Sequence, residues 1–180
     1  MRRIGWIAAA LGSAALVSAV AVQGVAAASP SHPSDHGHEG ATVLRFDTMT
    51  PVTGPYVGAA NPLRGIPGGG LPWMIKSGRG TLDQRGRLDV RVRGLVLANN
   101  SAVPAALRGT NPIAALDAVV SCQTIGADGS ATVSNVATAT APASPTGNAE
   151  IRALVKLPQP CIAPVILVGP PGAWFAATGG

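Results

Sequence analysis

Histidine, cysteine, lysine and aromatic residues are all scarce in this chain of 180 residues. Its three histidines all lie within residues 29–40, so the rest of the chain lacks a histidine for a Ser-His or Cys-His nucleophile pair and for a two-histidine zinc site. This absence argues against histidine-dependent hydrolysis. With only Lys76 and Lys156 as lysines and few aromatic residues, the core of residues 41–180 must be built mainly from Val, Ile, Leu and Ala.

The charge balance is weakly basic. The chain has 13 Lys and Arg against 8 Asp and Glu, a formal charge of +5, and two of the arginines lie at the extreme N-terminus. Such an excess is too small to indicate a nucleic-acid partner. The glycine-rich segment 65–70 lacks the Gly-Lys-Ser/Thr of a phosphate-binding loop, and we expect no cofactor.

The first 28 residues have the pattern of a secretory signal peptide. Arg2 and Arg3 precede an uncharged apolar run, residues 4–22, and the small residues Val25–Ala28 form a cleavage-like end. We therefore expect export through the general secretory route, cleavage after Ala28 and no transmembrane segment in the mature protein. An uncleaved membrane anchor is the alternative, because 25 uncharged residues are long enough to span a bilayer.

Residues 29–40 are polar, contain proline and glycine, and have no apolar side chain to bury, so we expect a disordered tail. Within it His32, His36 and His38 form an H-x3-H-x-H pattern, and imidazole nitrogens bind zinc, nickel and copper. A flexible segment does not preorganise its ligands, so any metal capture here should be weak.

Residues 41–180 have the pattern of a single all-β domain. Leu88, Val90 and Val92 alternate with charged residues, as in a strand with one buried and one exposed face. The preceding Asp83–Gly86 segment is typical of a hairpin turn. We expect an antiparallel β-sandwich of the immunoglobulin-like or Greek-key type, with a small β-barrel as the alternative. About eight strands are predicted, at residues 42–48, 71–82, 87–97, 118–124, 131–140, 149–157, 161–168 and 173–178.

Cys122 and Cys161 are the only cysteines, and each lies in a predicted strand. In an exported protein they are expected to form a disulfide bond, because the extracellular environment is oxidising. A redox pair or metal site is disfavoured, since the chain has no Cys-x-x-Cys motif.

Four arginines lie close together around the predicted hairpin. Arg87, Arg91 and Arg93 share the exposed face of one strand, and Arg85 lies in the adjoining turn. Guanidinium groups bind carboxylates and phosphates in a bidentate manner, so this face is a candidate site for an acidic cell-envelope polymer or an anionic lipid surface. The alternative is a solvated face that keeps the strand from pairing with other chains.

The resulting hypothesis is a secreted, non-enzymatic binding or structural domain. An alternative from another class is a carboxylate-dependent hydrolase of extracellular glycans, which needs two suitably spaced carboxylates. A third is weak metal capture by the histidine tail. Asp83 and Asp128 look like turn residues, whereas Asp89 and Asp117 are predicted at exposed strand positions; the remaining carboxylates of the domain are Asp47 and Glu150.

Overall fold

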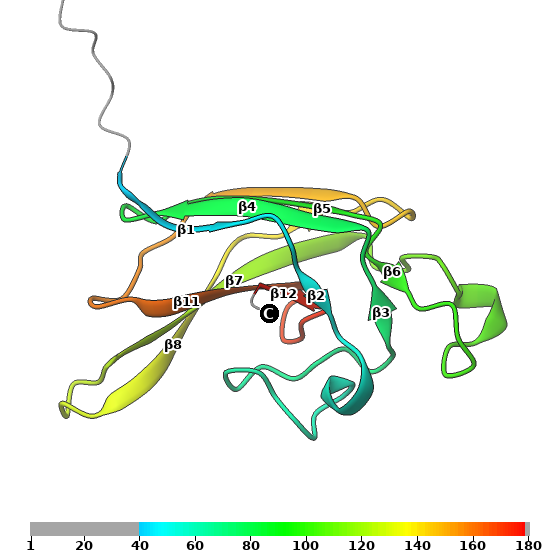
Figure 1. The fold of residues 1–180 in the computed structure, drawn as a ribbon, viewed down its shortest axis with the longest axis horizontal. Coiled ribbons are helices and arrows are strands. Elements are labelled where there is room, and N and C mark those ends of the chain that lie inside the picture. The colour runs from blue at the N-terminus through cyan, green and yellow to red at the C-terminus, as the bar shows by residue number, and fades with distance from the viewer. Residues whose placement is uncertain (1–39, 179–180) are drawn as a thin grey trace, which may run out of the picture. The chain divides into compact units, whose positions relative to one another are not determined.

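The computed structural model describes residues 40–178 of the chain, and in this part the protein is all-β. The predicted leader, residues 1–28, lies outside the described residues. The same holds for the predicted histidine tail, residues 29–40, except for its last residue, Gly40. Twelve strands and two short 3-10 helices are present (Figure 1). They are β1 Thr42–Phe46, β2 Thr50–Pro51, η1 Gly54–Tyr56, β3 Trp73–Met74, β4 Ser77–Asp83, β5 Arg87–Arg93, β6 Val96–Leu97, η2 Ala105–Leu107, β7 Ala115–Ile125, β8 Ala131–Ala137, β9 Ala141–Pro142, β10 Ala149–Leu154, β11 Ile162–Gly169 and β12 Ala176–Ala177.

These strands form two main antiparallel sheets and one small ribbon. The first sheet has the order β1-β4-β5-β10, and the second has the order β2-β12-β11-β7-β8, with β9 also paired to β7. β3 and β6 form the ribbon. The two main sheets are arranged as in a sandwich (Figure 1), and the described sheets do not close on themselves. The predicted sandwich is therefore confirmed, whereas the alternative of a small barrel is wrong.

Side chains from the facing sides of both sheets form the hydrophobic core. Leu88, Val90 and Val92 of β5 are fully buried, as their alternation with charged residues predicts. Val120 of β7 and Ile166 of β11 are cross-strand partners in the second sheet, and both are fully buried. Apolar burial on this scale is the main stabilising contribution in a domain with few aromatic residues.

The hairpin between β4 and β5 forms as predicted. Leu82 and Leu88 are partners, and the Asp83 carboxylate accepts hydrogen bonds from the backbone N–H groups of Arg85 and Arg87. Gly86 has φ +83°, a left-handed conformation that glycine adopts without steric cost. The turn chemistry therefore sets the register of the pair that carries most of the arginines.

Both arms of this hairpin are shorter than the sequence suggests. The predicted strand 71–82 is divided into β3 and β4, and the predicted strand 87–97 into β5 and β6. Gly94 lies between β5 and β6 with φ +63°. At this residue the chain leaves the first sheet, so that Val96 and Leu97 pair with β3 instead.

A long loop, residues 52–72, lies against the second sheet on the side away from the core. The Asn135 side chain of β8 donates to the carbonyl oxygen of Arg64, and the N–H of Gly69 donates to the carbonyl oxygen of Trp174. Strand β7 is consequently buried on both faces in its central part. Asp117, predicted at an exposed position, is only 5% exposed, so that prediction is wrong.

Burial of Asp117 gives the free energy of unfolding a pH dependence that can be measured. Desolvation raises the pKa of this carboxyl above its ordinary value, although a backbone hydrogen bond lowers it in part. The folded protein then holds a proton that the unfolded chain has released, so stability falls as the pH rises from the ordinary aspartate pKa through the raised one. We expect Asp117→Asn to raise the melting temperature at pH 7 and to leave it unchanged at pH 3.

Asp128 provides a control with the opposite sign. Hydrogen bonds from the Ser130 hydroxyl and backbone N–H lower the pKa of Asp128, which is exposed in the β7–β8 turn. Its stabilising contribution is present above the ordinary aspartate pKa and is lost as the pH falls through the lowered one. Asp128→Asn should therefore lower the melting temperature slightly at pH 7. If both variants change the melting temperature at pH 7 in the same direction, the raised pKa of Asp117 is contradicted.

Candidate functional site

The outward surface of the first sheet is rich in arginine. We define the arginine face as the charged side chains of segments 42–47, 77–93 and 149–154, which include the β4–β5 turn. The face contains seven arginines and four carboxylates, so it has a formal excess of three positive charges. The arginines are Arg45, Arg79, Arg85, Arg87, Arg91, Arg93 and Arg152, and the carboxylates are Asp47, Asp83, Asp89 and Glu150.

Four of these side chains form a closed ring of ion pairs between β5 and β10. Arg91 Nη2 lies 2.9 Å from Glu150 Oε1, and Arg91 Nε lies 3.5 Å from Asp89 Oδ1. Arg152 Nε donates to Asp89 Oδ2 at 2.9 Å, and its Nη2 contacts Glu150. The hydrogen bond to Asp89, together with the charge of Glu150, raises the pKa of Arg152. Arg91 and Arg152 are therefore already occupied by carboxylates of the protein.

Arg87 is held more loosely. Its Nε lies 3.8 Å from Asp83 Oδ2, and its side chain is 77% exposed. An exposed pair at this distance contributes little to stability, about 0–1 kcal/mol. Arg87 therefore remains able to contact a ligand.

Four other arginines of the face, Arg45, Arg79, Arg85 and Arg93, are exposed and form no salt bridge with any residue between 40 and 178. Arg79 of β4 lies directly opposite Arg91 of β5. Like charges in directly opposite positions destabilise a sheet, so this pair departs from the usual pattern of cross-strand pairing. Such departures from local stability rules are expected at functional sites.

Open depressions lie on both sides of the ion-pair ring. One is lined by Arg45, Arg79 and Arg91 together with Asp89. Another is lined by Arg91 and Arg93 with Glu150. Each depression thus places an unpaired guanidinium beside one that the ring holds in position.

The structure places all four arginines selected from the sequence on or beside this face. The face also contains three arginines that were not selected from the sequence, namely Arg45, Arg79 and Arg152. The turn at residues 83–86 fixes which residues of β4 and β5 are opposite, so the hairpin register could have revealed Arg79. Arg152 becomes a neighbour of Asp89 only through the pairing of β5 with β10, for which the sequence gives no local signal.

The carboxylates have different environments. Asp128 lies in a turn as predicted, whereas Asp83 is the last residue of β4, next to the β4–β5 turn, and Asp117 is buried. Asp47 and Asp89 line the same open depression, but arginines surround them. Asp89 is bound by Arg91 and Arg152 in the ion-pair ring, so its two carboxylate oxygens already contact groups of the protein.

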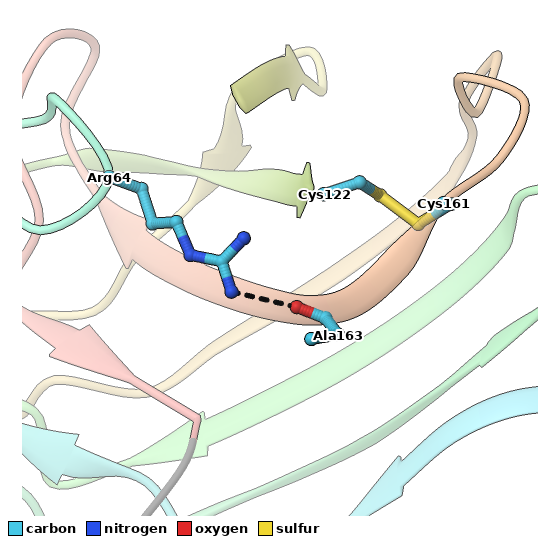
Figure 2. The surroundings of a disulfide bond; sticks show 4 residues. All are labelled: Arg64, Cys122, Cys161 and Ala163. Carbon is cyan, nitrogen blue, oxygen red and sulfur yellow. Dashed lines mark hydrogen bonds between the residues drawn. A yellow bond between two sulfur atoms is a disulfide. The ribbon is translucent and has the colours of Figure 1, made fainter. Parts of the chain in front are cut away.

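Cys122 and Cys161 form the predicted disulfide, with sulfur atoms 1.97 Å apart. The bond joins β7 to the segment immediately before β11, as Figure 2 shows. The two Cα atoms are 5.0 Å apart, within the usual range for such a bond. Neither cysteine is therefore available as a nucleophile or a metal ligand.

The other predicted features can be placed only in part. His32, His36 and His38, proposed as weak metal ligands, lie outside the described residues. Between residues 40 and 178 there is no cluster of three or more His, Cys, Asp or Glu side chains suited to a metal ion. The same part of the chain contains no helix of sufficient length and hydrophobicity to cross a membrane. Trp73 is a core residue, and its ring stacks on Phe175 with centroids 3.8 Å apart.

Comparison with known proteins gives no match: no family model, no curated protein and no solved structure is significantly similar to this chain. Its function must therefore be inferred from its own residues.

Proposed function

We propose that this protein is an exported, non-catalytic binding module that holds an extended acidic polymer of the cell envelope on its arginine face. The observation that carries the proposal is the group of exposed, unpaired arginines, Arg45, Arg79 and Arg93, beside the ion-pair ring. The disulfide and the leader-like N-terminus support an extracellular location.

The spacing of the arginines favours a polymer over a single small anion. Neighbouring strands of a sheet are about 4.8 Å apart, and Arg45 on β1 is offset by two residues from Arg91 on β5, so the two positions are separated by about 12 Å. Arg91 and Arg93 are about 7 Å apart along β5. A chain with regularly spaced carboxylates or phosphates can reach several of these groups at once, and each additional contact raises the overall affinity.

Replacing the unpaired arginines should weaken retention on an acidic polymer. We expect the triple variant Arg45→Ser, Arg79→Ser, Arg93→Ser to bind immobilised polygalacturonate about tenfold more weakly than the wild type at low salt, because each exposed charge pair is worth about 0.2–1 kcal/mol. Raised salt should release the wild type, since exposed charges are screened. Neutral dextran provides the reference matrix. Measuring dissociation constants at two ionic strengths tests the proposal.

Matched variants distinguish binding at the arginine face from nonspecific binding that depends only on the net charge of the protein. The same three positions changed to lysine keep the charge and should retain most of the binding. Arg108→Ser removes one exposed positive charge next to η2, outside the three segments of the face, and should bind polygalacturonate as the wild type does, whereas Arg79→Ser should not. If the triple serine variant binds as well as the wild type, the proposal fails. Tighter binding to phosphatidylglycerol vesicles than to polygalacturonate would replace the polymer with a lipid surface.

A further inference from the structure

Strand β8 is an edge strand of the second sheet, and it lacks the features that keep edges from pairing with other chains. The backbone groups on one side of an edge strand have no partner, so proteins shorten such strands or place charges and proline on them. The other three edges of the main sheets follow this rule: β1 contains Arg45, β10 contains Glu150 and Arg152, and β2 has two residues, one of them Pro51. β8 has seven residues, ATVSNVA, without charge, proline or glycine. Of these four edges, β8 is therefore the one open to another strand (Figure 1).

The unpaired backbone groups of β8 can be assigned to individual residues. At the two ends of the β7–β8 pair, the Thr138 N–H donates to the Ala118 carbonyl oxygen at 2.9 Å, and the Gly126 N–H donates to the Ser130 carbonyl oxygen at 2.8 Å. The register between these ends is unbroken, and hydrogen-bonded pairs alternate with non-bonded pairs in an antiparallel sheet. Even-numbered residues of β8 therefore bond to β7. The N–H and C=O groups of the odd-numbered residues point away from the sheet, and these residues are all exposed: Ala131, Val133, Asn135 and Ala137.

Nothing else in the described part of the chain occupies this edge. Between residues 40 and 178, no backbone hydrogen bond joins β8 to an element other than β7. Loop 52–72 reaches β8 through the Asn135 side chain, which donates to the Arg64 carbonyl oxygen, and Asn135 still remains exposed. The outward backbone groups of β8 are thus accessible to a partner.

The sequence of β8 is complementary to itself when two copies run antiparallel. A two-fold axis through Ser134 pairs the whole strand, and each outward N–H of one copy then meets an outward C=O of the other. Val133, which is 42% exposed, lies diagonal to its own counterpart, so pairing removes apolar surface of both copies from water. No like charges meet. The opposed pairs are Ala131 with Ala137, Thr132 with Val136, Val133 with Asn135, and Ser134 with its counterpart.

From these observations we propose that β8 is an interaction surface for a second copy of this chain, which adds antiparallel to the edge and joins the two copies of the second sheet into one continuous sheet. Two-fold contacts of this kind, in which both copies use the same surface, are the commonest in homo-oligomers. A single short strand buries little area, so the dimer is weak and forms as the protein concentration rises. The surface lies on the second sheet and does not depend on polymer binding by the arginine face.

The oligomeric state of the protein tests this proposal. We expect sedimentation equilibrium to show a reversible monomer–dimer equilibrium between micromolar and millimolar protein. Amide hydrogen exchange, followed by NMR over the same concentrations, identifies the surface. The amides of the odd-numbered residues of β8 should exchange more slowly as the concentration rises, whereas those of the even-numbered residues, already bonded to β7, should not respond.

Opposite charges at Val133 test the two-fold register. Val133→Lys and Val133→Glu each place two like charges diagonal to one another, so each variant alone should dimerise at least about fivefold more weakly than the wild type. An equimolar mixture of the two variants should recover the dimer, because opposite charges then meet. Leu154→Lys is the matched control: it adds the same charge at a 76% exposed position of β10, in the first sheet, and should dimerise as the wild type does.

The proposal is overturned if the protein stays monomeric at every concentration, a result that would leave the β8 edge to an extended segment of a different protein. It is also overturned if a dimer forms while the odd-numbered amides of β8 exchange at an unchanged rate, because the dimer then uses another surface. Failure of the mixed variants to recover the dimer contradicts the register through Ser134. The wild-type measurements decide the first two outcomes even if a variant fails to fold.

Discussion

Changing Cys122 and Cys161 together to alanine should lower the free energy of unfolding by about 4 kcal/mol. The bond joins residues 39 positions apart, and the loss follows from the larger conformational entropy of an unfolded chain that lacks the cross-link. In a domain of this size such a change lowers the melting temperature by about 10 °C or more. Chemical denaturation and thermal melting of both proteins provide the measurement.

A reducing agent supplies the internal control for this prediction. Reduced wild-type protein should unfold at nearly the same denaturant concentration as the double alanine variant, and the variant itself should not respond to the reductant. Cys122 is fully buried, so the wild type must be unfolded and refolded in the reductant to ensure complete reduction. A loss below about 1 kcal/mol, the size of an ordinary point-mutation effect, would contradict the prediction.

Gly86→Ala should have the second-largest effect, a loss of about 3 kcal/mol or more. A Cβ atom at this position would lie 1.8 Å from the carbonyl oxygen of Val155, and the φ of +83° is unfavourable for alanine by about 1–2 kcal/mol. The Val155 N–H also donates to the Gly86 carbonyl oxygen at 2.9 Å. The clash therefore disturbs the contact between the β4–β5 turn and the residue that follows β10.

Gly129 in the β7–β8 turn offers a matched control. Its φ is +81°, almost the same as that of Gly86, but no atom lies within 4 Å of the position where its Cβ would be. Gly129→Ala should therefore show only the conformational cost, about 1–2 kcal/mol. Denaturant titration of both variants gives the difference, which measures the steric clash at Gly86. Equal losses would mean that the chain near Val155 adjusts freely.

The features that could be predicted from the sequence depend on residues close together along the chain. The hairpin of β4 and β5 follows from the turn residues Asp83–Gly86 and from the alternation of Leu88, Val90 and Val92 with charged residues. The disulfide follows from the presence of only two cysteines, each of which lies in or next to a predicted strand. Neither the hairpin nor the disulfide requires knowledge of the rest of the fold to be predicted.

The features that could not be predicted depend on distant contacts. Asp117 was expected to be exposed because alternation gives one exposed face to each strand, but loop 52–72 lies on that side of the second sheet. A segment rich in proline and glycine has no pattern that tells which surface it contacts. Tyr56 and Trp174, whose ring centroids are 6.3 Å apart, are likewise more than a hundred positions apart in the sequence.

The arginine face could be predicted from the sequence only in part. Local alternation places Arg87, Arg91 and Arg93 together, yet it does not show which of them are neutralised. Pairing of β5 with β10 brings Glu150 opposite Arg91 and so removes that arginine from the free set. The exposed arginines that remain without an ion pair include Arg45 and Arg79, which belong to other strands.

The position of the disulfide has a consequence for how the two sheets stay connected during unfolding. The bond closes residues 122–161 into a covalent ring that includes β8 and β9, paired to the second sheet, and β10, part of the first sheet. After all noncovalent contacts are lost, β10 still cannot diffuse far from β7 and β11. Re-forming the contact between the sheets then requires closure of a shorter effective loop, which lowers its entropic cost. A single cross-link between β7 and the start of β11, two inner strands of one sheet, thereby keeps a strand of the other sheet close to its native neighbours in the unfolded chain.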